Sequence, residues 1–351
     1  MAITRFIEYY ELAHNFVSSS EPFIIYGAGT NGQKVANYLQ QYPVKLQGFC
    51  DSDAKKHGKK YLGLPILSPQ QAVNSGYMII IASTWHQQII SSLLKIGAKR
   101  FLNFSLIGLA KQPMVSNIAE RLFELEQKLT DQQSKVIFKA LFEYLLNDTE
   151  TTIPVSDYPQ YLHPEIRRLP HINMIDGGAC HGESLGTFKD YLTNHLDMLC
   201  FEPEASNYKI LVDNISKKKL DEHVSVLCAG LWSEDTQLRF ASPSASGSNA
   251  NCNVNEQGDI VINTHAIDTI CAERNFTPNL IKMDIEGAEV SALIGAKNTI
   301  RQHKPTLAIC LYHHLDDLWI IPEYIHSLRP DYKMSLGHHS DGWFETVLYC
   351  Y

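Results

Sequence analysis

Residues 172–184, INMIDGGACHGES, decide the fold that the rest of the chain is expected to adopt. An apolar run ends in an acid, Asp176, and small residues follow where a backbone would have to turn tightly. Apolar residues at helical spacing, Leu185 and Phe188 among them, come next. We therefore predict a strand, a glycine turn and a helix, and in open α/β sheets ligands bind at such strand ends.

A second acid is expected at the same edge of the sheet. Glu202 follows the apolar run 198–201, 26 residues after Asp176, and on a neighbouring strand its carboxylate would suit ribose hydroxyls. The turn departs from G-x-G-x-x-G and has an acid where a pyrophosphate would be repelled. S-adenosylmethionine, which has an ammonium and a sulfonium but no phosphate, fits better. A glycine turn of some other α/β domain is the alternative. The predicted cofactor-binding residues are Asp176, Gly177, Gly178, Gly182, Ser184 and Glu202.

Whole-chain composition indicates a globular protein of two domains. The chain has 351 residues, of which 44% are hydrophobic and 19% charged, and each of two such domains could bury its own core. The formal net charge is −8 and there is no long Lys/Arg block, whereas a nucleic-acid surface needs clustered cations. We therefore expect a small-molecule acceptor and no nucleic-acid partner, and we leave a homo-oligomer open.

The cysteines and the hydrophobic pattern indicate the cell compartment in which we expect the protein. Eight cysteines are scattered without a C-x-x-C pair, which is typical of reduced core thiols rather than of a disulfide framework. The first residues contain no apolar signal segment, and no window reaches 18 uncharged apolar residues. A cytoplasmic protein without a membrane partner is the expectation.

The N-terminal part of the chain contains a glycine turn of a different type. A predicted strand at 23–26 precedes Gly27, Gly29 and Gly32, a complete G-x-G-x-x-G, and Asp51 ends the next predicted strand. In a dinucleotide fold such glycines approach the phosphates and such an acid takes a ribose hydroxyl. The unit spans only about 85 residues, roughly half of a two-part dinucleotide fold, so a complete NAD site is not expected.

Hydrophobic periodicity and turn residues predict the elements in between. Residues 77–82 are a predicted strand, and residues 63–69 are predicted as a loop that leads into a helix. Two helices are predicted between residues 112 and 150, with Thr130-Asp131 capping the second. The small polar run 242–249 is predicted as a loop near the ligand cleft or a plain linker. The predicted domains are an N-terminal module (1–110), a helical linker (111–150) and a C-terminal domain (151–351).

The motifs of the C-terminal half occur in a characteristic order. They are Phe201-Glu202-Pro203, IKMDIEGAE at 281–289, Gly295-Ala296, and His313-His314 followed by DLWIIP at 317–322. In this order they resemble the FkbM-family methyltransferases, over about residues 130–351. The resemblance implies a class I S-adenosylmethionine-dependent fold with a seven-stranded sheet ending in a β-hairpin, and usually O-methylation of a sugar or polyketide-type hydroxyl. The sequence departs from the pattern at His181, where Asn or a small polar residue is commoner.

The N-terminal module resembles the small Rossmann-like modules of sugar-nucleotide and polysaccharide-modifying proteins. The resemblance rests on the turn YGAGTNG at 26–32 and the strand GFCD at 48–51. A module kept for docking or dimerisation, with an empty turn, is the alternative. The whole chain is thus expected to be an α/β protein with two Rossmann-like domains. The residues implied to hold a nucleotide or nucleotide-sugar are Gly27, Gly29, Gly32 and Asp51.

The implied hydroxyl acceptor has to lose a proton as the new bond forms, because a free alcohol is scarcely ionised near neutral pH. Asp284 and the pair His313-His314 end predicted neighbouring parallel strands, and one histidine of the pair can face the cleft while the other packs. We predict that His314 is the base, that Asp284 orients the acceptor or the imidazole, and that Glu286 belongs to the same catalytic site. Asp284, or His338 of the second pair His338-His339 at the end of another predicted strand, is the alternative base, and histidines that only shape the pocket are the other alternative.

Other chemistries are weighed against this prediction. Asp284, Glu286 and Glu289 could hold Mg²⁺ or Mn²⁺, but acids at a helix N-terminus explain the pattern as well, so no metal site is predicted. The complete G-x-G-x-x-G leaves a nucleotide-dependent oxidoreductase or epimerase as the alternative enzyme class. A binding protein that keeps both folds without catalysis is the non-enzymatic alternative.

Overall fold

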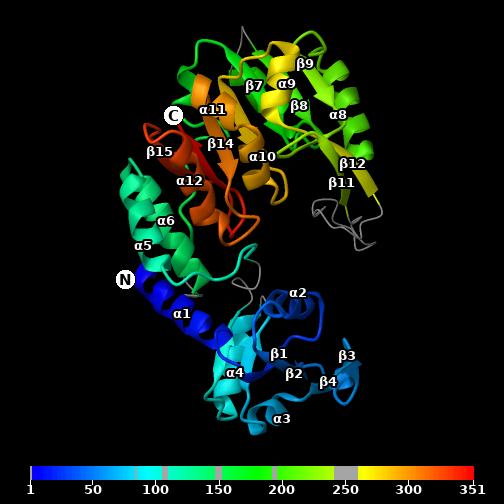
Figure 1. Cartoon of the computed structure of the whole chain (residues 1–351), viewed down its shortest axis with the longest axis vertical. Coiled ribbons are helices and arrows are strands. Elements are labelled where there is room, and N and C mark those ends of the chain that lie inside the picture. The colour runs from blue at the N-terminus through cyan, green and yellow to red at the C-terminus, as the bar shows by residue number, and fades with distance from the viewer. Residues whose placement is uncertain (1, 84, 105–109, 147–151, 192–195, 241–259) are drawn as a thin grey trace. The chain divides into compact units, whose positions relative to one another are not determined.

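The computed structural model describes residues 2–83, 85–104, 110–146, 152–191, 196–240 and 260–351 (Figure 1). The chain divides into two compact units. The first comprises Met1–Phe123, Leu141–Thr151 and His314–Asp316, and the second comprises Glu124–Ala140, Thr152–His313 and Asp317–Tyr351. The loop predicted at 242–249 lies outside the described residues, and the division into 1–110, 111–150 and 151–351 stays a prediction.

The first unit is built around a six-stranded sheet with the order β3-β4-β2-β1-β5-β6. Neighbouring strands are parallel except β3 and β4. Because β1 lies between β2 and β5, the strand order reverses there, and the glycine turn after β1 opens at this switch point. The elements are α1 (Ala2–Val17), β1 (Pro22–Tyr26), α2 (Thr30–Leu39), β2 (Lys45–Cys50), η1 (Ala54–Lys56), β3 (Lys60–Tyr61), β4 (Leu64–Leu67), α3 (Pro69–Asn74), β5 (Met78–Ile81), α4 (His86–Lys95) and β6 (Phe101–Asn103).

The prediction of a loop at 63–69 is wrong. Leu64–Leu67 forms β4, which is paired in parallel with β2 through Phe49 and Ile66. Pro65 suggested a loop because proline cannot donate to a strand ladder. The tertiary contact decides otherwise, since Ile66 is buried in the core while Pro65 is exposed.

Two helices connect the sheets along the chain, as predicted. They are α5 (Ile118–Lys128) and α6 (Gln132–Leu145). The amide of Ser134 donates to Asp131 Oδ1 at 2.7 Å, which confirms the predicted cap at the start of α6.

The second unit contains a seven-stranded sheet with the order β15-β16-β14-β13-β7-β8-β9. Five neighbouring strands from β14 to β9 are parallel, and β16 is antiparallel to both β14 and β15. The structure thus confirms the α/β class and the seven strands with a terminal hairpin, whereas the assignment of both units to the Rossmann type stays a prediction. The elements are η3 (Ile166–Arg168), β7 (Ile172–Gly177), α7 (Glu183–Tyr191), β8 (Leu196–Phe201), α8 (Ala205–Lys217), β9 (Val224–Leu227), β10 (Gly230–Leu231), β11 (Thr236–Phe240), β12 (Ile260–His265), α9 (Ile267–Arg274), β13 (Leu280–Met283), α10 (Glu289–Gly295), α11 (Lys297–His303), β14 (Thr306–Cys310), α12 (Asp317–Leu328), β15 (Met334–His338) and β16 (Thr346–Cys350).

A small sheet with the order β10-β12-β11 was not predicted. Its central strand, β12, buries Ile262 and Thr264 and exposes Val261 and Asn263 between them. This alternation is the signal of a half-buried strand, so the sequence contained the information.

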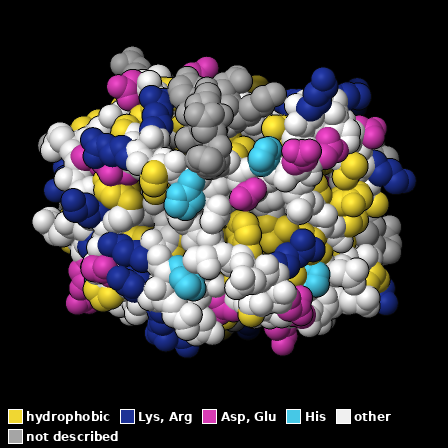
Figure 2. Space-filling model, turned by 90° about the horizontal axis from the view of Figure 1, so that it is seen from above, with side chains coloured by type: hydrophobic (Ala, Val, Ile, Leu, Met, Phe, Trp, Pro, Cys, Tyr) yellow, Lys and Arg dark blue, Asp and Glu magenta, His cyan; other side chains and the backbone are white. Residues whose placement is uncertain are grey.

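The surface and the helices bear on the predicted partners. On the face shown in Figure 2, Lys and Arg side chains are scattered among acidic and apolar ones and do not gather into one basic area. Among the described residues, no helix combines the length and the apolar character needed to cross a bilayer. The predicted absence of a nucleic-acid partner stays a prediction.

Gly178 marks a close approach between the ends of β7 and β13. A Cβ atom at this position would lie 1.9 Å from the carbonyl oxygen of Asp284, and the residue has a φ of +72°. Both the contact and the left-handed backbone therefore require glycine.

Gly178→Ala is expected to lower the free energy of unfolding by about 2 kcal/mol or more, because it adds a left-handed backbone penalty to an overpacked contact. Gly186→Ala inside α7 is the matched control. Its Cβ would meet only the end of the flexible Lys218 side chain, at 3.1 Å, and alanine favours a helix by about 1 kcal/mol. Urea unfolding followed by circular dichroism measures both variants, and equal midpoints would contradict the expectation.

Candidate active site

The glycine turn after β7 is held against the end of β8 by backbone hydrogen bonds. The amides of Gly178 and Ala179 both donate to the carbonyl oxygen of Phe201 at 3.1 Å. The amide of Cys180 donates to Glu202 Oε2 at 2.9 Å. The turn and Glu202 therefore meet at one edge of the sheet, as expected from the sequence.

Glu202 is almost fully buried, and its carboxylate organises this edge. Glu202 Oε1 accepts the amide of Glu204 at 2.9 Å. Burial raises the pKa of Glu202, and the hydrogen bonds from the Glu204 and Cys180 amides oppose the rise. A carboxylate offers about four acceptor positions, and these two amides use two of them.

Asp176 lies at the end of β7 and is fully buried. Ser184 Oγ donates to Asp176 Oδ2 at 2.9 Å, and Lys282 Nζ lies 2.9 Å from Asp176 Oδ1. The two predicted cofactor residues Asp176 and Ser184 thus bond to each other. Their contact with a cofactor stays a prediction, and the geometry gives Asp176 a further task, which is to hold Lys282 beneath the turn.

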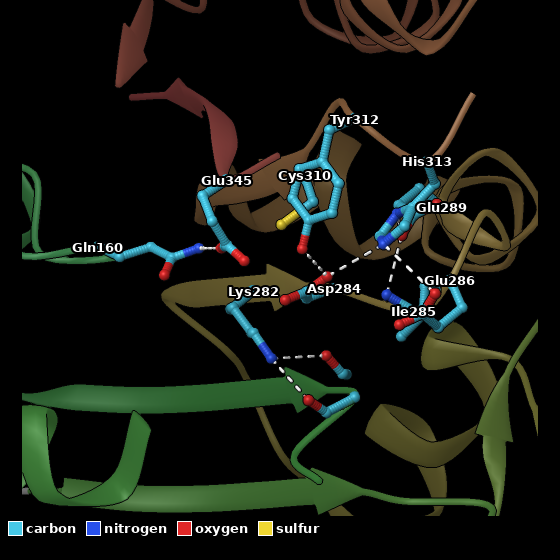
Figure 3. A network of polar contacts seen from close by, with 12 residues as sticks. Gln160, Lys282, Asp284, Ile285, Glu286, Glu289, Cys310, Tyr312, His313 and Glu345 are labelled. Carbon is cyan, nitrogen blue, oxygen red and sulfur yellow. Dashed lines mark hydrogen bonds and ion pairs between the residues drawn. The ribbon is translucent and has the colours of Figure 1, made fainter. Parts of the chain in front are cut away.

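Lys282 is a charged residue in the middle of the buried strand β13. Its ammonium donates to the carbonyl oxygens of Gly177 and Gly178 at 3.0 and 2.8 Å (Figure 3). Burial alone would lower the pKa of Lys282, but Asp176 and Asp284 outweigh burial and raise it. The buried cation therefore ties the glycine turn to β13.

Asp284 follows β13 and is the centre of a polar network (Figure 3). The hydroxyls of Tyr312 and Tyr161 donate to its Oδ1 and Oδ2, both at 2.8 Å. His313 Nε2 lies 3.3 Å from Oδ1. Burial would raise the pKa of Asp284, but His313 and Lys282 lower it well below its usual value. The carboxylate is therefore ionised and held in place.

His313, the first histidine of the predicted pair, lies between two acids. His313 Nδ1 is 2.9 Å from Oε1 of the fully buried Glu289. Burial would lower the pKa of His313, but Glu289 and Asp284 raise it well above its usual value. This imidazole is therefore protonated and cannot accept a proton. His314 groups with the first unit, and its predicted role as base stays a prediction.

Glu286 is the predicted catalytic residue with the most unusual environment. Its φ is +55°, so it lies before α10 in a left-handed conformation, whereas Glu289 is the first residue of α10, as in the helix N-terminus alternative. Burial, partly offset by His313, raises the pKa of Glu286 to about 7, and Asp284 adds to the rise. Such a carboxyl exchanges a proton near neutral pH.

The second predicted histidine pair belongs to the core. His338 is fully buried with Nδ1 2.8 Å from Thr346 Oγ1, and His339 Nε2 lies 3.2 Å from the Tyr349 hydroxyl. Burial lowers the pKa of both imidazoles, that of His339 to about 4. Since β15 and β14 are both antiparallel to β16, His338 does lie at the predicted edge. Its side chain points into the core, which argues against His338 as the base.

The N-terminal glycine turn is closely packed except at its middle glycine. A Cβ at Gly27 would lie 2.8 Å from the Ala82 carbonyl oxygen, and a Cβ at Gly32 would lie 1.9 Å from the Gly27 carbonyl oxygen. No heavy atom lies within 4 Å of a Cβ built at Gly29. The space in front of Gly29 is therefore open within the described residues.

Asp51 faces this turn together with a lysine. Asp51 Oδ2 accepts the amide of Ala28 at 3.1 Å and Lys56 Nζ at 2.7 Å. Lys56 Nζ also donates to the Ala28 carbonyl oxygen at 3.2 Å. Burial would raise the pKa of Asp51, but Lys56 and the backbone amides lower it. A fixed cation thus lies at the turn.

Several residues of these networks were missed by the sequence analysis. The role of Lys282 could have been predicted, because a lysine inside a buried strand needs a partner for its charge. Tyr161 and Tyr312 lie far from Asp284 in sequence and carried no signal of this kind. The missed residues are Lys56, Tyr161, Lys282, Glu289 as a partner of His313, and Tyr312.

Comparison with known proteins agrees with the predicted family. A family model described as "Methyltransferase FkbM domain" matches residues 176–333, and one described as "C2185-like, N-terminal" matches residues 19–101. The structure is similar to that of the methyltransferase FkbM from Methylobacillus flagellatus KT, with 23% identity, 100% of this chain and 99% of that chain covered, and a TM-score of 0.61. A comparison with curated proteins gives no match.

Two other solved structures resemble parts of the chain. Precorrin-6y C5,15-methyltransferase from Geobacter metallireducens GS-15 has 11% identity over 56% of this chain and 91% of that chain, with a TM-score of 0.31. UDP-D-quinovosamine 4-dehydrogenase from Vibrio fischeri has 26% identity over 24% of this chain and 80% of that chain, with a TM-score of 0.21. Likeness at this level carries no argument about function.

The match over residues 176–333, the full-length likeness in fold and the ordered motifs agree with one another. Residues 176–333 of this chain match the methyltransferase FkbM domain.

Proposed function

We propose that the protein transfers a methyl group from S-adenosylmethionine to a hydroxyl of a small acceptor, a sugar or nucleotide-sugar. The observation that carries the proposal is the position of Glu202, at the end of β8 and bonded to the glycine turn of β7 through the Cys180 amide at 2.9 Å. In a parallel α/β sheet this edge is where a nucleoside binds.

The residues at this edge fit the proposed cofactor. Glu202 keeps an acceptor position for a ribose hydroxyl, and the carboxylates of Asp284 and Glu286 suit a ligand with an ammonium and a sulfonium. The bound cofactor would supply a methyl group that is already activated by its positive sulfur. The chain then has to align the acceptor oxygen with that methyl group, which can account for much of the acceleration.

Glu202→Gln is expected to weaken binding of S-adenosylhomocysteine by more than about 1 kcal/mol, because it removes the charge from a hydrogen-bonded carboxylate. Glu204→Gln, the same change two residues further on, is the matched control, since the Glu204 side chain caps α8 by accepting the Asn207 amide and the Ser206 hydroxyl. Isothermal titration calorimetry measures both. Equal affinities in the two variants, with the fold intact, would remove Glu202 from the cofactor site.

We propose Glu286 as the group that accepts the acceptor's proton. It is partly exposed and its pKa, raised by burial, is about 7, which is close to the ideal for a general base near neutral pH. Asp284, held by the two tyrosines, orients the acceptor hydroxyl by accepting a hydrogen bond. His313 stays protonated and fixes Asp284, which makes it a positioning residue. His314, the base predicted from sequence, is the competing candidate.

Glu286→Gln is expected to lower kcat by about 10²- to 10⁴-fold while leaving affinity for S-adenosylhomocysteine near wild type. The raised pKa of Glu286 means that its carboxyl is protonated below about pH 7 and becomes a base above it. Wild-type kcat/KM should therefore rise with pH through about 7, and the variant should lack this rise.

His314→Ala is the decisive comparison for this assignment. If His314→Ala abolished turnover and the pH-dependent rise while Glu286→Gln retained both, His314 would be the base and the assignment to Glu286 would be wrong.

We further propose that the N-terminal unit binds a nucleotide or nucleotide-sugar at Gly27, Gly29, Gly32 and Asp51. Open space in front of Gly29 would let a phosphate approach the backbone at the start of α2, whose N-cap has no side-chain hydrogen bond. Lys56 adds a positive charge at the same turn. These features support capture of the acceptor through its nucleotide.

Gly29→Val is expected to weaken binding of uridine diphosphate by about tenfold or more, because the side chain would fill the approach to the phosphate site. The extended φ of −162° at Gly29 accommodates valine, so thermal stability should change little. Affinity for S-adenosylhomocysteine in the same variant is the internal control. Binding of NAD instead of uridine diphosphate would favour the oxidoreductase alternative.

A further inference from the structure

The turn between β7 and α7 gathers three side chains that are typical metal ligands. One ligand atom each from Cys180, His181 and Glu183 lies within 4.8 Å of the other two. Cys180 and His181 are partly buried, and Glu183 is exposed. Among the described residues, this is the one group of His, Cys, Asp and Glu side chains that meets this spacing.

The hydrogen-bond chain behind His181 sets the protonation of its ring. Asn207 Oδ1, an amide oxygen that can only accept, lies 3.0 Å from His181 Nε2. His181 Nε2 therefore carries a hydrogen and donates it. In a neutral imidazole the other nitrogen, Nδ1, then has a free lone pair.

His181 Nδ1 lies close to another acceptor. Glu183 Oε1 is 3.4 Å from Nδ1, and Glu183 Oε2 accepts the His181 amide at 3.1 Å. A cation between Nδ1 and Oε1 would make this contact between two acceptors attractive. A proton would satisfy them, as an imidazolium ion pair, and so would a metal ion. The third ligand atom, Cys180 Sγ, favours the metal, because an imidazolium pair makes no use of a thiol.

We propose that Cys180 Sγ, His181 Nδ1 and a carboxylate oxygen of Glu183 bind a zinc-type divalent metal ion. Thiolate, imidazole and carboxylate are the ligands that Zn²⁺ prefers, and three protein ligands leave a fourth position for water. Bond lengths of about 2.0–2.3 Å in a tetrahedral site separate ligand atoms by roughly 3.3–3.8 Å. Rotation of the exposed Glu183 side chain closes the remaining gap.

The arrangement behind the ligands is also that of a metal site. Ligating histidines typically donate their second ring N–H to a fixed acceptor, which orients the ring, and Asn207 is that acceptor for His181. On binding, the Cys180 thiol releases its proton to solvent and the thiolate forms the bond to the metal. Because the Cys180 amide also bonds to Glu202, a bound ion would stiffen the turn. The site itself does not depend on methyl transfer.

Cobalt substitution tests the proposal on the reduced full-length protein. Titration with Co²⁺ is expected to produce a thiolate-to-cobalt charge-transfer band in the near ultraviolet that saturates at one equivalent and is displaced by Zn²⁺. Cys180→Ser should abolish the band. Cys228→Ser is the matched control, because Cys228 is an exposed free thiol outside the cluster, and it should leave the band unchanged.

Two other variants keep the test informative if Cys180→Ser does not fold. Glu183→Gln alters an exposed side chain and should weaken Co²⁺ binding about tenfold or more, and Asn207→Ala should weaken it about 10- to 100-fold by freeing the imidazole. Absence of the band in the wild type, a band that survives in Cys180→Ser, or unchanged affinity in Glu183→Gln would overturn the proposal and leave an imidazolium pair. Binding of S-adenosylhomocysteine to the same samples tests the proposed function separately.

Discussion

The buried ion pair between Lys282 and Asp176 is the interaction on which the candidate active site of the second unit depends. Both side chains are almost fully excluded from solvent, and their charged atoms lie 2.9 Å apart. Loss of one partner of such a pair leaves a buried charge, which typically costs about 3–5 kcal/mol. Lys282 also bonds to the carbonyl oxygens of Gly177 and Gly178, so the same cation joins two central strands and fixes the turn between β7 and α7.

The charges above this pair are ordered so that neighbouring acids differ in protonation. Asp284 accepts hydrogen bonds from Tyr161 and Tyr312 and is held ionised by His313 and Lys282, with a lowered pKa. His313 offsets the burial of Glu286 only in part, so the pKa of Glu286 rises to about 7. Two carboxyls with separated pKa values can take different roles in one reaction. This separation is why we assign orientation to Asp284 and proton acceptance to Glu286.

The glycines of the turn in the first unit also differ from one another, because two are required by close packing and one faces open space. Gly27 and Gly32 are required by backbone contacts inside the turn, whereas Gly29 faces open space. Asp51, predicted to hold a ribose hydroxyl, already accepts Lys56 Nζ at 2.7 Å. A ligand at this turn would therefore meet a carboxylate paired with a cation, which suits a phosphate better than an isolated acid would. This pairing supports our proposal of a phosphorylated ligand.

Local patterns determined much of what the sequence predicted correctly. Strands β7 and β8, the glycine turn after β7, the cap of α6 and the terminal hairpin follow from signals within a few neighbouring residues. The same holds for the positions of Asp176, Glu202 and Asp284 at strand ends, because the end of an apolar run is visible in the sequence. The order of the motifs indicated the resemblance to the family. The prediction of a loop at 63–69 was wrong because pairing of β4 with β2 outweighed the tendency of Pro65 to interrupt a strand.

Only the tertiary structure decided which side chains meet. His313 lies beside Asp284 and Glu289, and Tyr161, which donates to Asp284, comes from a segment far away in sequence. The protonation of His313 and Glu286 depends on these partners and on burial, neither of which is encoded locally. The sequence alone therefore determined the fold class and the sheet edge at which Asp176, Glu202 and Asp284 lie, whereas long-range packing set the partners and the burial of the individual acids and histidines.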